Sequence, residues 1–141
     1  MKKCFVIVLS MLLLFSSVGA TSADSINTEE SIILDRFIGL YKANATLSIN
    51  NGTANCTGVA RAKTSSFSLV ATLSLQKRSG VSWSTIASWS GSGSGITGVI
   101  LNKTKSGLPS GTYRCKLYVN VYGSNGTYIE STTVYSQSCS I

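Results

Sequence analysis

The chain has 141 residues and a formal net charge of +7, and it contains no histidine. This length suffices for one domain with a single hydrophobic core. Without histidine the chain lacks the commonest general base, the usual partner of a nucleophilic Ser or Cys, and the commonest transition-metal ligand. The composition therefore argues against most hydrolases and transition-metal enzymes.

The N-terminus has the features of a secretory signal peptide. Lys2 and Lys3 precede an apolar stretch over residues 5–15, and small residues follow, with candidate cleavage sites after Ala20 and Ala23. The apolar stretch is too short to span a bilayer as a stable helix. We therefore expect residues 1–23 to be removed, with no transmembrane anchor left after cleavage. The product would be secreted or extracellular, with cell-wall association as one location, in an oxidising environment.

Residues 24–42 form an acidic segment that becomes apolar. Thr28 could begin a short helix with acidic residues in its first turn. A linker, or a pro-segment that folds against the rest of the chain, fits the segment equally well. The acids of this segment are Asp24, Glu29, Glu30 and Asp35.

The remaining body is strongly basic, because Glu130 is the only acid from Phe37 onward. Such a charge favours anionic partners, which include wall polymers, acidic glycans, lipid headgroups and nucleic acid. A simpler interpretation is that the charge only keeps a Ser/Thr-rich exported domain soluble.

From residue 43 to residue 141 the pattern is that of short strands divided by Gly, Ser and Asn. Asn50-Asn-Gly52 predicts a turn, Gly91–Gly95 a flexible loop, and Asn102–Gly107 a second loop. The spacing predicts an all-β fold, an immunoglobulin-like antiparallel β-sandwich of about seven strands. The expected strands cover residues 43–49, 53–63, 67–77, 81–89, 96–101, 112–121 and 127–135.

The clearest single motif lies in the sixth expected strand. Tyr113 stands two residues before Cys115 and directly after a Pro/Gly turn. This is the arrangement of the tyrosine corner of immunoglobulin-like domains, in which the Tyr hydroxyl bonds back to the turn and the Cys reaches across to strand B. Cys56 has the matching position, so we expect a Cys56–Cys115 disulfide, worth on the order of 4 kcal/mol by loop entropy. Cys139 would then be an unpaired tail thiol or the link of a covalent dimer.

No recognisable catalytic or cofactor site accompanies this pattern. A glycosidase needs two carboxylates, whereas the body holds only Glu130. There is no Cys-x-x-Cys and no phosphate-binding Gly-Lys-Ser/Thr motif. We therefore expect a protein that is not an enzyme and that binds no metal or cofactor.

Hairpin registers decide which side chains face outward. With a three-residue loop over 124–126, Ile129 would lie opposite Val121 and Tyr135 opposite Cys115, both toward the core. A two-residue turn would instead bring Glu130 and Val134 inward. The first register is preferred, because an unpaired carboxylate is costly to bury.

This register predicts a basic and aromatic strip on two adjacent strands. Such a strip could hold an anionic glycan or single-stranded nucleic acid by charge and stacking, and export makes nucleic acid the weaker candidate. An ordinary solvated sheet face is the alternative. The strip consists of Arg114, Lys116, Tyr118, Tyr122 and Tyr128, with Glu130 beside it.

The two tryptophans depend on another hairpin. A three-residue loop over 78–80 pairs Trp83 with Leu75 and turns both Trp83 and Trp89 toward the core, which is the preferred reading because large aromatic side chains normally supply buried area. A two-residue turn at Ser79-Gly80 would expose both indoles as a stacking platform for sugar rings.

The chain resembles a family of small secreted β-sandwich proteins from Gram-positive bacteria, a domain of unknown function. The resemblance implies export and a β-sandwich and brings no catalytic residues. Asp35 departs from the family pattern, and Cys115 and Cys139 lie outside it. The matching stretches are Leu34–Phe37, Ala45–Ile49, Gly52, Ala54–Cys56, Leu75–Lys77, Trp83, Trp89, Gly111–Arg114, Val121-Tyr122, Gly126, Ile129-Glu130 and Tyr135-Ser136.

These observations lead to one hypothesis and one rival. The chain is interpreted as a secreted, non-catalytic module that binds anionic cell-wall polymer or glycan. The rival is an effector or toxin-like protein that acts on another cell's membrane, although no amphipathic helix supports it.

Overall fold

The computed structural model describes residues 36–141, and this part of the chain contains strands and no helix. The predicted signal peptide and the acidic residues up to 35 lie outside the described residues. The strands are β1 (Leu40–Asn50), β2 (Thr53–Ala62), β3 (Ser68–Ser79), β4 (Ser82–Ser94), β5 (Val99–Lys105), β6 (Thr112–Tyr122), β7 (Tyr128–Tyr135) and β8 (Cys139–Ser140).

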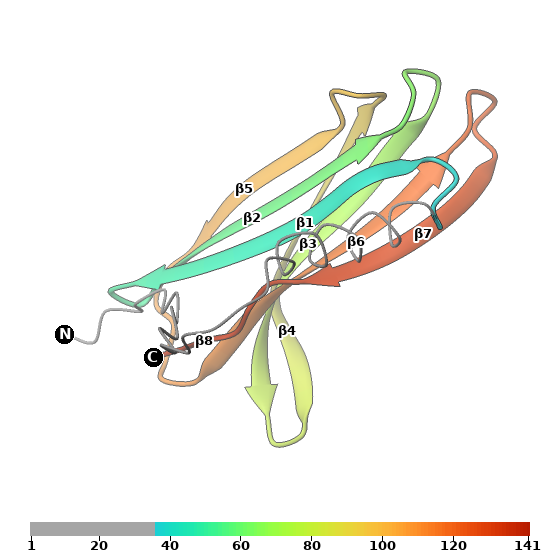
Figure 1. The fold of residues 1–141 in the computed structure, drawn as a ribbon. Coiled ribbons are helices and arrows are strands. Elements are labelled where there is room, and N and C mark those ends of the chain that lie inside the picture. The colour runs from blue at the N-terminus through green and yellow to red at the C-terminus, as the bar shows by residue number, and fades with distance from the viewer. Residues whose placement is uncertain (1–35) are drawn as a thin grey trace, which may run out of the picture.

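The strands form two antiparallel sheets that face each other (Figure 1). One sheet has the order β1-β2-β5, and the other has the order β4-β3-β6-β7 with β8 beside β6. The all-β prediction is confirmed, and the arrangement is compatible with a β-sandwich. The hairpin between β3 and β4 projects away from the other strands, at the bottom of Figure 1.

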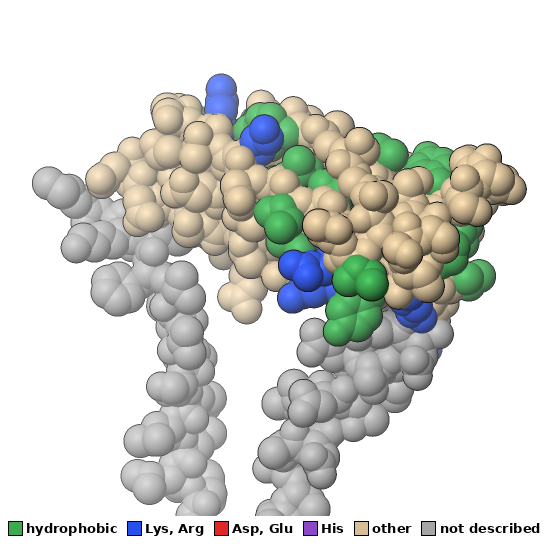
Figure 2. Space-filling view, turned by 90° about the horizontal axis from the view of Figure 1, so that it is seen from above, with side chains coloured by type: hydrophobic (Ala, Val, Ile, Leu, Met, Phe, Trp, Pro, Cys, Tyr) green, Lys and Arg blue, Asp and Glu red, His purple; other side chains and the backbone are tan. Residues whose placement is uncertain are grey.

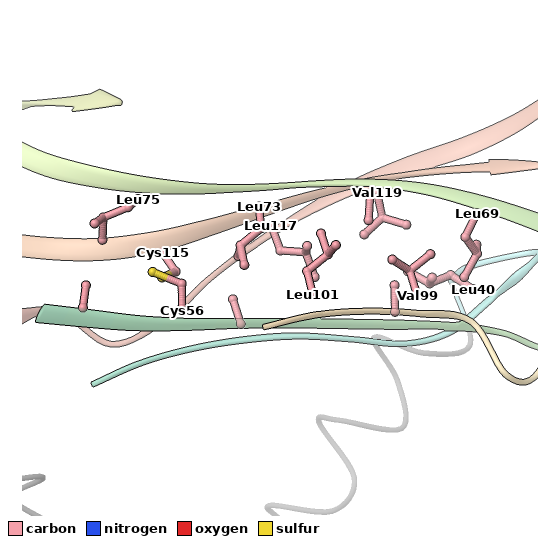
Figure 3. Packing of buried hydrophobic residues seen from close by; sticks show 14 of the residues in the cluster. Leu40, Cys56, Leu69, Leu73, Leu75, Val99, Leu101, Cys115, Leu117 and Val119 are labelled. Atoms are coloured by element: carbon pink, nitrogen blue, oxygen red, sulfur yellow. The ribbon is translucent and has the colours of Figure 1, made fainter. Parts of the chain in front are cut away.

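The core lies between the sheets and follows the period-two pattern of the sequence. In β3 the buried residues Leu69, Leu73 and Leu75 alternate with outward polar residues. Each of them lies opposite a buried residue of β6. The first sheet supplies mainly small residues, such as Ala54 and Ala60. Figure 3 shows labelled buried side chains of both sheets in the space between the sheets.

The predicted turn at Asn50-Asn-Gly52 is present as a tight hairpin. Asn50 pairs with Thr53, and both residues between them have positive φ, 49° at Asn51 and 70° at Gly52. Asn-Gly is the favoured sequence for this turn because it tolerates left-handed backbone. The strand before the turn begins at Leu40, three residues earlier than predicted.

Two predicted loops are strands instead. Residues 91–94 of the glycine-rich stretch continue β4, and β5 runs on to Lys105. The glycines serve close packing between β4 and β5. A Cβ atom on Gly93 would lie 2.0 Å from the carbonyl oxygen of Gly98, and one on Gly91 would lie 2.8 Å from Leu101.

The predicted register of the β6–β7 hairpin is wrong. Val121 pairs with Glu130, and Ile129 is the extra residue of a bulge. Consequently Glu130 and Val134 share the inward side, and Tyr135 lies outward opposite Lys116. The physical reason is that the inward Glu130 carboxylate has partners. It accepts three backbone hydrogen bonds, from Ile38, Gly39 and Leu40.

The predicted register of the β3–β4 hairpin is also wrong. Ser79 pairs with Ser82, so Trp83 lies opposite Arg78 and not opposite Leu75. A second bulge at Ile86 then shifts the remaining pairs, and Trp89 lies opposite the buried Leu73. The bulge therefore places the two indoles on opposite faces of the sheet, an outcome that neither predicted turn allowed.

Candidate basic-aromatic binding face

The predicted strip lies on the outer face of the β4-β3-β6-β7 sheet. β6 presents Arg114, Lys116, Tyr118 and Tyr122 in alternation with buried residues. Tyr128 of β7 lies opposite Tyr122 on the same face. We call this surface the basic-aromatic face. It consists of Arg114, Lys116, Tyr118, Tyr122 and Tyr128, together with Trp83, Gln76 and Tyr135, which the structure adds.

Arg114 is held between two aromatic rings. Its guanidinium carbon lies 4.3 Å from the ring centroid of Trp83 and 4.0 Å from that of Tyr135. Its Nε donates a hydrogen bond of 2.9 Å to Oε1 of Gln76, a residue only 7 % exposed. Cation–π contacts of this kind contribute about 0.5–1 kcal/mol each at exposed sites. Four neighbouring strands thus fix one guanidinium.

The terminal nitrogens of that guanidinium remain available. Among the described residues, the bond to Gln76 is the only hydrogen bond that the Arg114 side chain makes. Lys116 follows on the same face, opposite Tyr135 on one side and Ser74 on the other. Tyr135, which is 49 % exposed, therefore has the Arg114 guanidinium against its ring and Lys116 as its neighbour across the ladder.

Tyrosines dominate the other end of the face. The rings of Tyr122 and Tyr128 meet edge to face, with centroids 6.1 Å apart and planes at 75°. The Tyr128 hydroxyl is 3.1 Å from Ser131 Oγ, and the ring is 55 % exposed. Tyr118 lies between these rings and the cations along β6 and is also exposed. Exposed rings at this spacing can stack on sugar rings or other flat groups.

Within residues 36–141, no acidic side chain competes for these cations. Glu130, the only acid among residues 36–141, faces away and is bonded to backbone. Its carboxylate accepts hydrogen bonds from Ile38 N (2.8 Å), Gly39 N (2.7 Å) and Leu40 N (2.9 Å). In the view of Figure 2, basic side chains lie at separate points on a mostly uncharged polar surface, and no acidic side chain is seen.

The predicted indole platform is not formed. Trp83 belongs to the outer face and is covered in part by Arg114, whereas Trp89 is partly buried against the core. The preference for core packing therefore describes Trp89 and not Trp83. No sequence pattern predicts the bulge at Ile86. Trp83 and Trp89 are each compatible with an inward or an outward position on the strand, so neither residue reveals that the register shifts between them.

Sequence reasoning missed three members of the face, Gln76, Tyr135 and Trp83. Tyr135 was assigned to the core through the wrong β6–β7 register. The run Ile38–Leu40 could have corrected this assignment. Its backbone nitrogens donate hydrogen bonds to the Glu130 carboxylate, and these bonds offset the cost of turning that carboxylate inward. Gln76 directly follows the apolar and small residues 68–75 of β3, and a buried polar side chain at the end of such a run is a sign of a specific partner.

The tyrosine corner lies at the end of β6. The buried Tyr113 hydroxyl donates a hydrogen bond to the carbonyl oxygen of Pro109, the back-bond that the sequence pattern predicts. Burial raises the pKa of this hydroxyl. The contact fixes the turn from which Arg114 and Lys116 emerge.

The predicted Cys56–Cys115 disulfide is not formed. The two side chains face each other across the core (Figure 3), yet the sulfur atoms are not at disulfide distance and both residues are thiols. The hydrogen bond to Cys56 and burial both raise the pKa of Cys115. Cys139 is buried in β8 opposite Tyr113.

Within residues 36–141, no group of three or more His, Cys, Asp or Glu side chains is placed to hold a metal ion. No helix of this part of the chain is long and apolar enough to cross a membrane.

Comparisons with known proteins give no identification. No protein-family model matches the chain, and no similar curated protein is found. The resemblance to a family of small secreted proteins therefore stays a hypothesis drawn from the residues alone.

Proposed function

We propose that the protein is a secreted, non-catalytic binding module, and that its basic-aromatic face holds anionic cell-wall polymer or acidic glycan. The observation that carries this proposal is the arrangement of Arg114. Two rings and Gln76 hold its guanidinium, while its terminal nitrogens have no partner among the described residues.

Such a guanidinium is well suited to an oxyanion. Its planar fork matches the two oxygens of a carboxylate or phosphate, and charge-assisted hydrogen bonds of this kind are about twice as strong as neutral ones. Because the side chain is already fixed, binding costs little further rotamer entropy. Lys116 adds a second positive charge next to it.

The length of the face suits a polymer. Arg114 and Tyr122 are the ends of the face along β6, and the eight residue steps between them span about 26 Å at ~3.3 Å per step. An extended chain lying along β6 would meet cations at one end and exposed tyrosine rings at the other. Charge would attract the polymer and stacking would hold its neutral rings.

We further propose an immunoglobulin-like fold. The Tyr113 back-bond and the facing pair Cys56 and Cys115 support this assignment. β4 pairs with β3 and not with β5, so the fourth strand belongs to the second sheet. In the constant-type arrangement the fourth strand lies in the first sheet, and the shift adds Trp83 to the face that carries β6.

Sedimentation with isolated bacterial cell walls tests the function. The purified protein is mixed with walls before and after removal of their anionic polymer, over a range of salt concentrations. The proposal predicts retention that falls steeply with salt and is lost on stripping. Equal retention on stripped walls would contradict the anionic ligand, and no retention on either would contradict wall binding. Dye release from anionic vesicles would favour the rival, an effector that acts on membranes.

A further inference from the structure

β4 is a free edge of the larger sheet. It is the terminal strand in the order β4-β3-β6-β7 and is bonded to β3 alone. Outside the ladders, no backbone hydrogen bond of the described chain involves residues 82–93. Its outward backbone groups are therefore a template for another strand.

The β4 edge carries none of the charged side chains that hinder strand pairing at the other free edges. No charged residue occurs between Arg78 and Lys103, so the whole of β4 is uncharged. The edge strand β1 contains Lys42, and β5 contains Lys103 and Lys105. Natural sheets commonly place Lys on free edges to prevent pairing, and β4 lacks this device.

Part of the edge is limited by local features. The bulge at Ile86 interrupts regular pairing on one side, and the carbonyl of Gly98 approaches Gly93 on the other. The regular stretch between them covers residues 87–92. Its side chains alternate, with Ser88, Ser90 and Ser92 outward and Ala87, Trp89 and Gly91 inward.

We propose that β4 pairs with β4 of a second copy of this chain, antiparallel and about a twofold axis at Ser90. In that register Ser90 lies opposite its own copy, Ser88 opposite Ser92, and Trp89 opposite Gly91. Gly91 places no side chain opposite the indole, and its own inward side is covered by Leu101 of the same copy. The sequence from Ser88 to Ser92 is complementary to itself in this arrangement.

Hydroxyl pairs continue across such an interface. Ser90 is 3.1 Å from Thr72, and Ser88 is 3.1 Å from Ser74, oxygen to oxygen. Pairing at Ser90 would extend this ladder into the second copy. Two bodies this basic repel each other, and the repulsion is smallest where uncharged edges meet, so β4 is the edge at which a second copy approaches at the lowest electrostatic cost.

The twofold axis has a consequence for the surface. Residues directly opposite in an antiparallel pair lie on the same side of the sheet, so both basic-aromatic faces would look in one direction. Two linked sites bind a repetitive polymer more tightly than one. The pairing itself does not depend on the proposed function and is tested without a ligand.

Sedimentation velocity over a concentration series tests the pairing. The wild-type protein is expected to pass from monomer to dimer. Ser90→Lys would place like charges opposite each other and is expected to remain monomeric. Val81→Lys, in the fully exposed turn before β4, adds the same charge outside the pairing stretch and should dimerise like the wild type.

Cysteine cross-linking tests the register. Ser90→Cys is expected to form a disulfide-linked dimer under mild oxidation, whereas Ser84→Cys, beyond the bulge, is not. A wild-type protein that is monomeric at all concentrations would overturn the proposal and leave the edge to a strand of another protein. Dimers that survive Ser90→Lys and fail to cross-link at Ser90→Cys would place the interface elsewhere and also overturn it.

Discussion

Oε1 of Glu130 lies 2.7 Å from the backbone nitrogen of Gly39, which donates a hydrogen bond to it. The same oxygen accepts from Leu40 N, and Oε2 accepts from Ile38 N. One side chain of β7 thus satisfies three successive backbone donors at the start of β1, 90 to 92 positions away in the sequence. The only acid of the described chain thus links β7 to the start of β1 and takes no part in the basic-aromatic face.

Glu130→Gln is expected to lower the free energy of unfolding by about 1–3 kcal/mol, because charge-assisted bonds are replaced by a neutral amide that also carries donors. Denaturant titration measures this loss. Hydrogen exchange at Ile38, Gly39 and Leu40 should accelerate at the same time. Gln137→Ala, at an exposed position beyond β7, is the control and should change neither quantity. Unchanged stability and exchange in Glu130→Gln would contradict the role given to the carboxylate.

Gly93→Ala distinguishes a close-packed strand from the flexible loop that the glycine-rich pattern predicts. The added Cβ would lie 2.0 Å from Gly98 O and 2.7 Å from its carbonyl carbon, and neither atom is at the end of a flexible side chain. We expect a loss of about 2 kcal/mol or more in unfolding free energy. Ser94→Ala, the next outward position, should cost little. A Gly93→Ala variant as stable as the wild type would show that the stretch behaves as a loop.

The core thiols give a prediction about reactivity. The thiolate is the reactive form, and the raised pKa of Cys115 keeps that form scarce there. The hydrogen bond with Cys115 lowers the pKa of Cys56, so Cys56 is protected by its burial, which keeps reagents out. Iodoacetamide at pH 8 should therefore modify neither Cys56 nor Cys115 in the folded protein, and both after unfolding without reductant. Peptide mass spectrometry follows each site. Rapid modification in the folded state, or none after unfolding, would contradict a buried thiol pair.

The fold could be predicted largely from the alternation of apolar and polar residues along the strands. The apolar residues of β3 and β6 recur at period two, so strand type, sheet face and core membership follow from the sequence. The tyrosine corner follows from Tyr113 and its turn. What the sequence did not provide is the number of residues in each hairpin, since a bulge of one residue turns the following side chains over.

The candidate face shows the same limit. Arg114, Lys116 and Tyr118 were assigned correctly to the outer side because they lie on the regular strand β6. Tyr135 and Trp83 lie beyond bulges or turns, and their contacts with Arg114 join residues far apart in the chain. The inward position of Glu130 depends on backbone donors at residues 38–40, and no local sequence pattern predicts where that segment lies.

The most direct test of the proposed function compares two double variants in binding to isolated cell walls. Arg114→Ala with Lys116→Ala removes two charges from the basic-aromatic face. Lys103→Ala with Lys105→Ala removes two charges from exposed positions of β5, in the other sheet. We predict that the first pair weakens binding at least about tenfold, or ~1.4 kcal/mol, while the second weakens it less than about threefold. Equal losses in the two variants would show that diffuse charge alone attracts the polymer, and would contradict a binding site on this face.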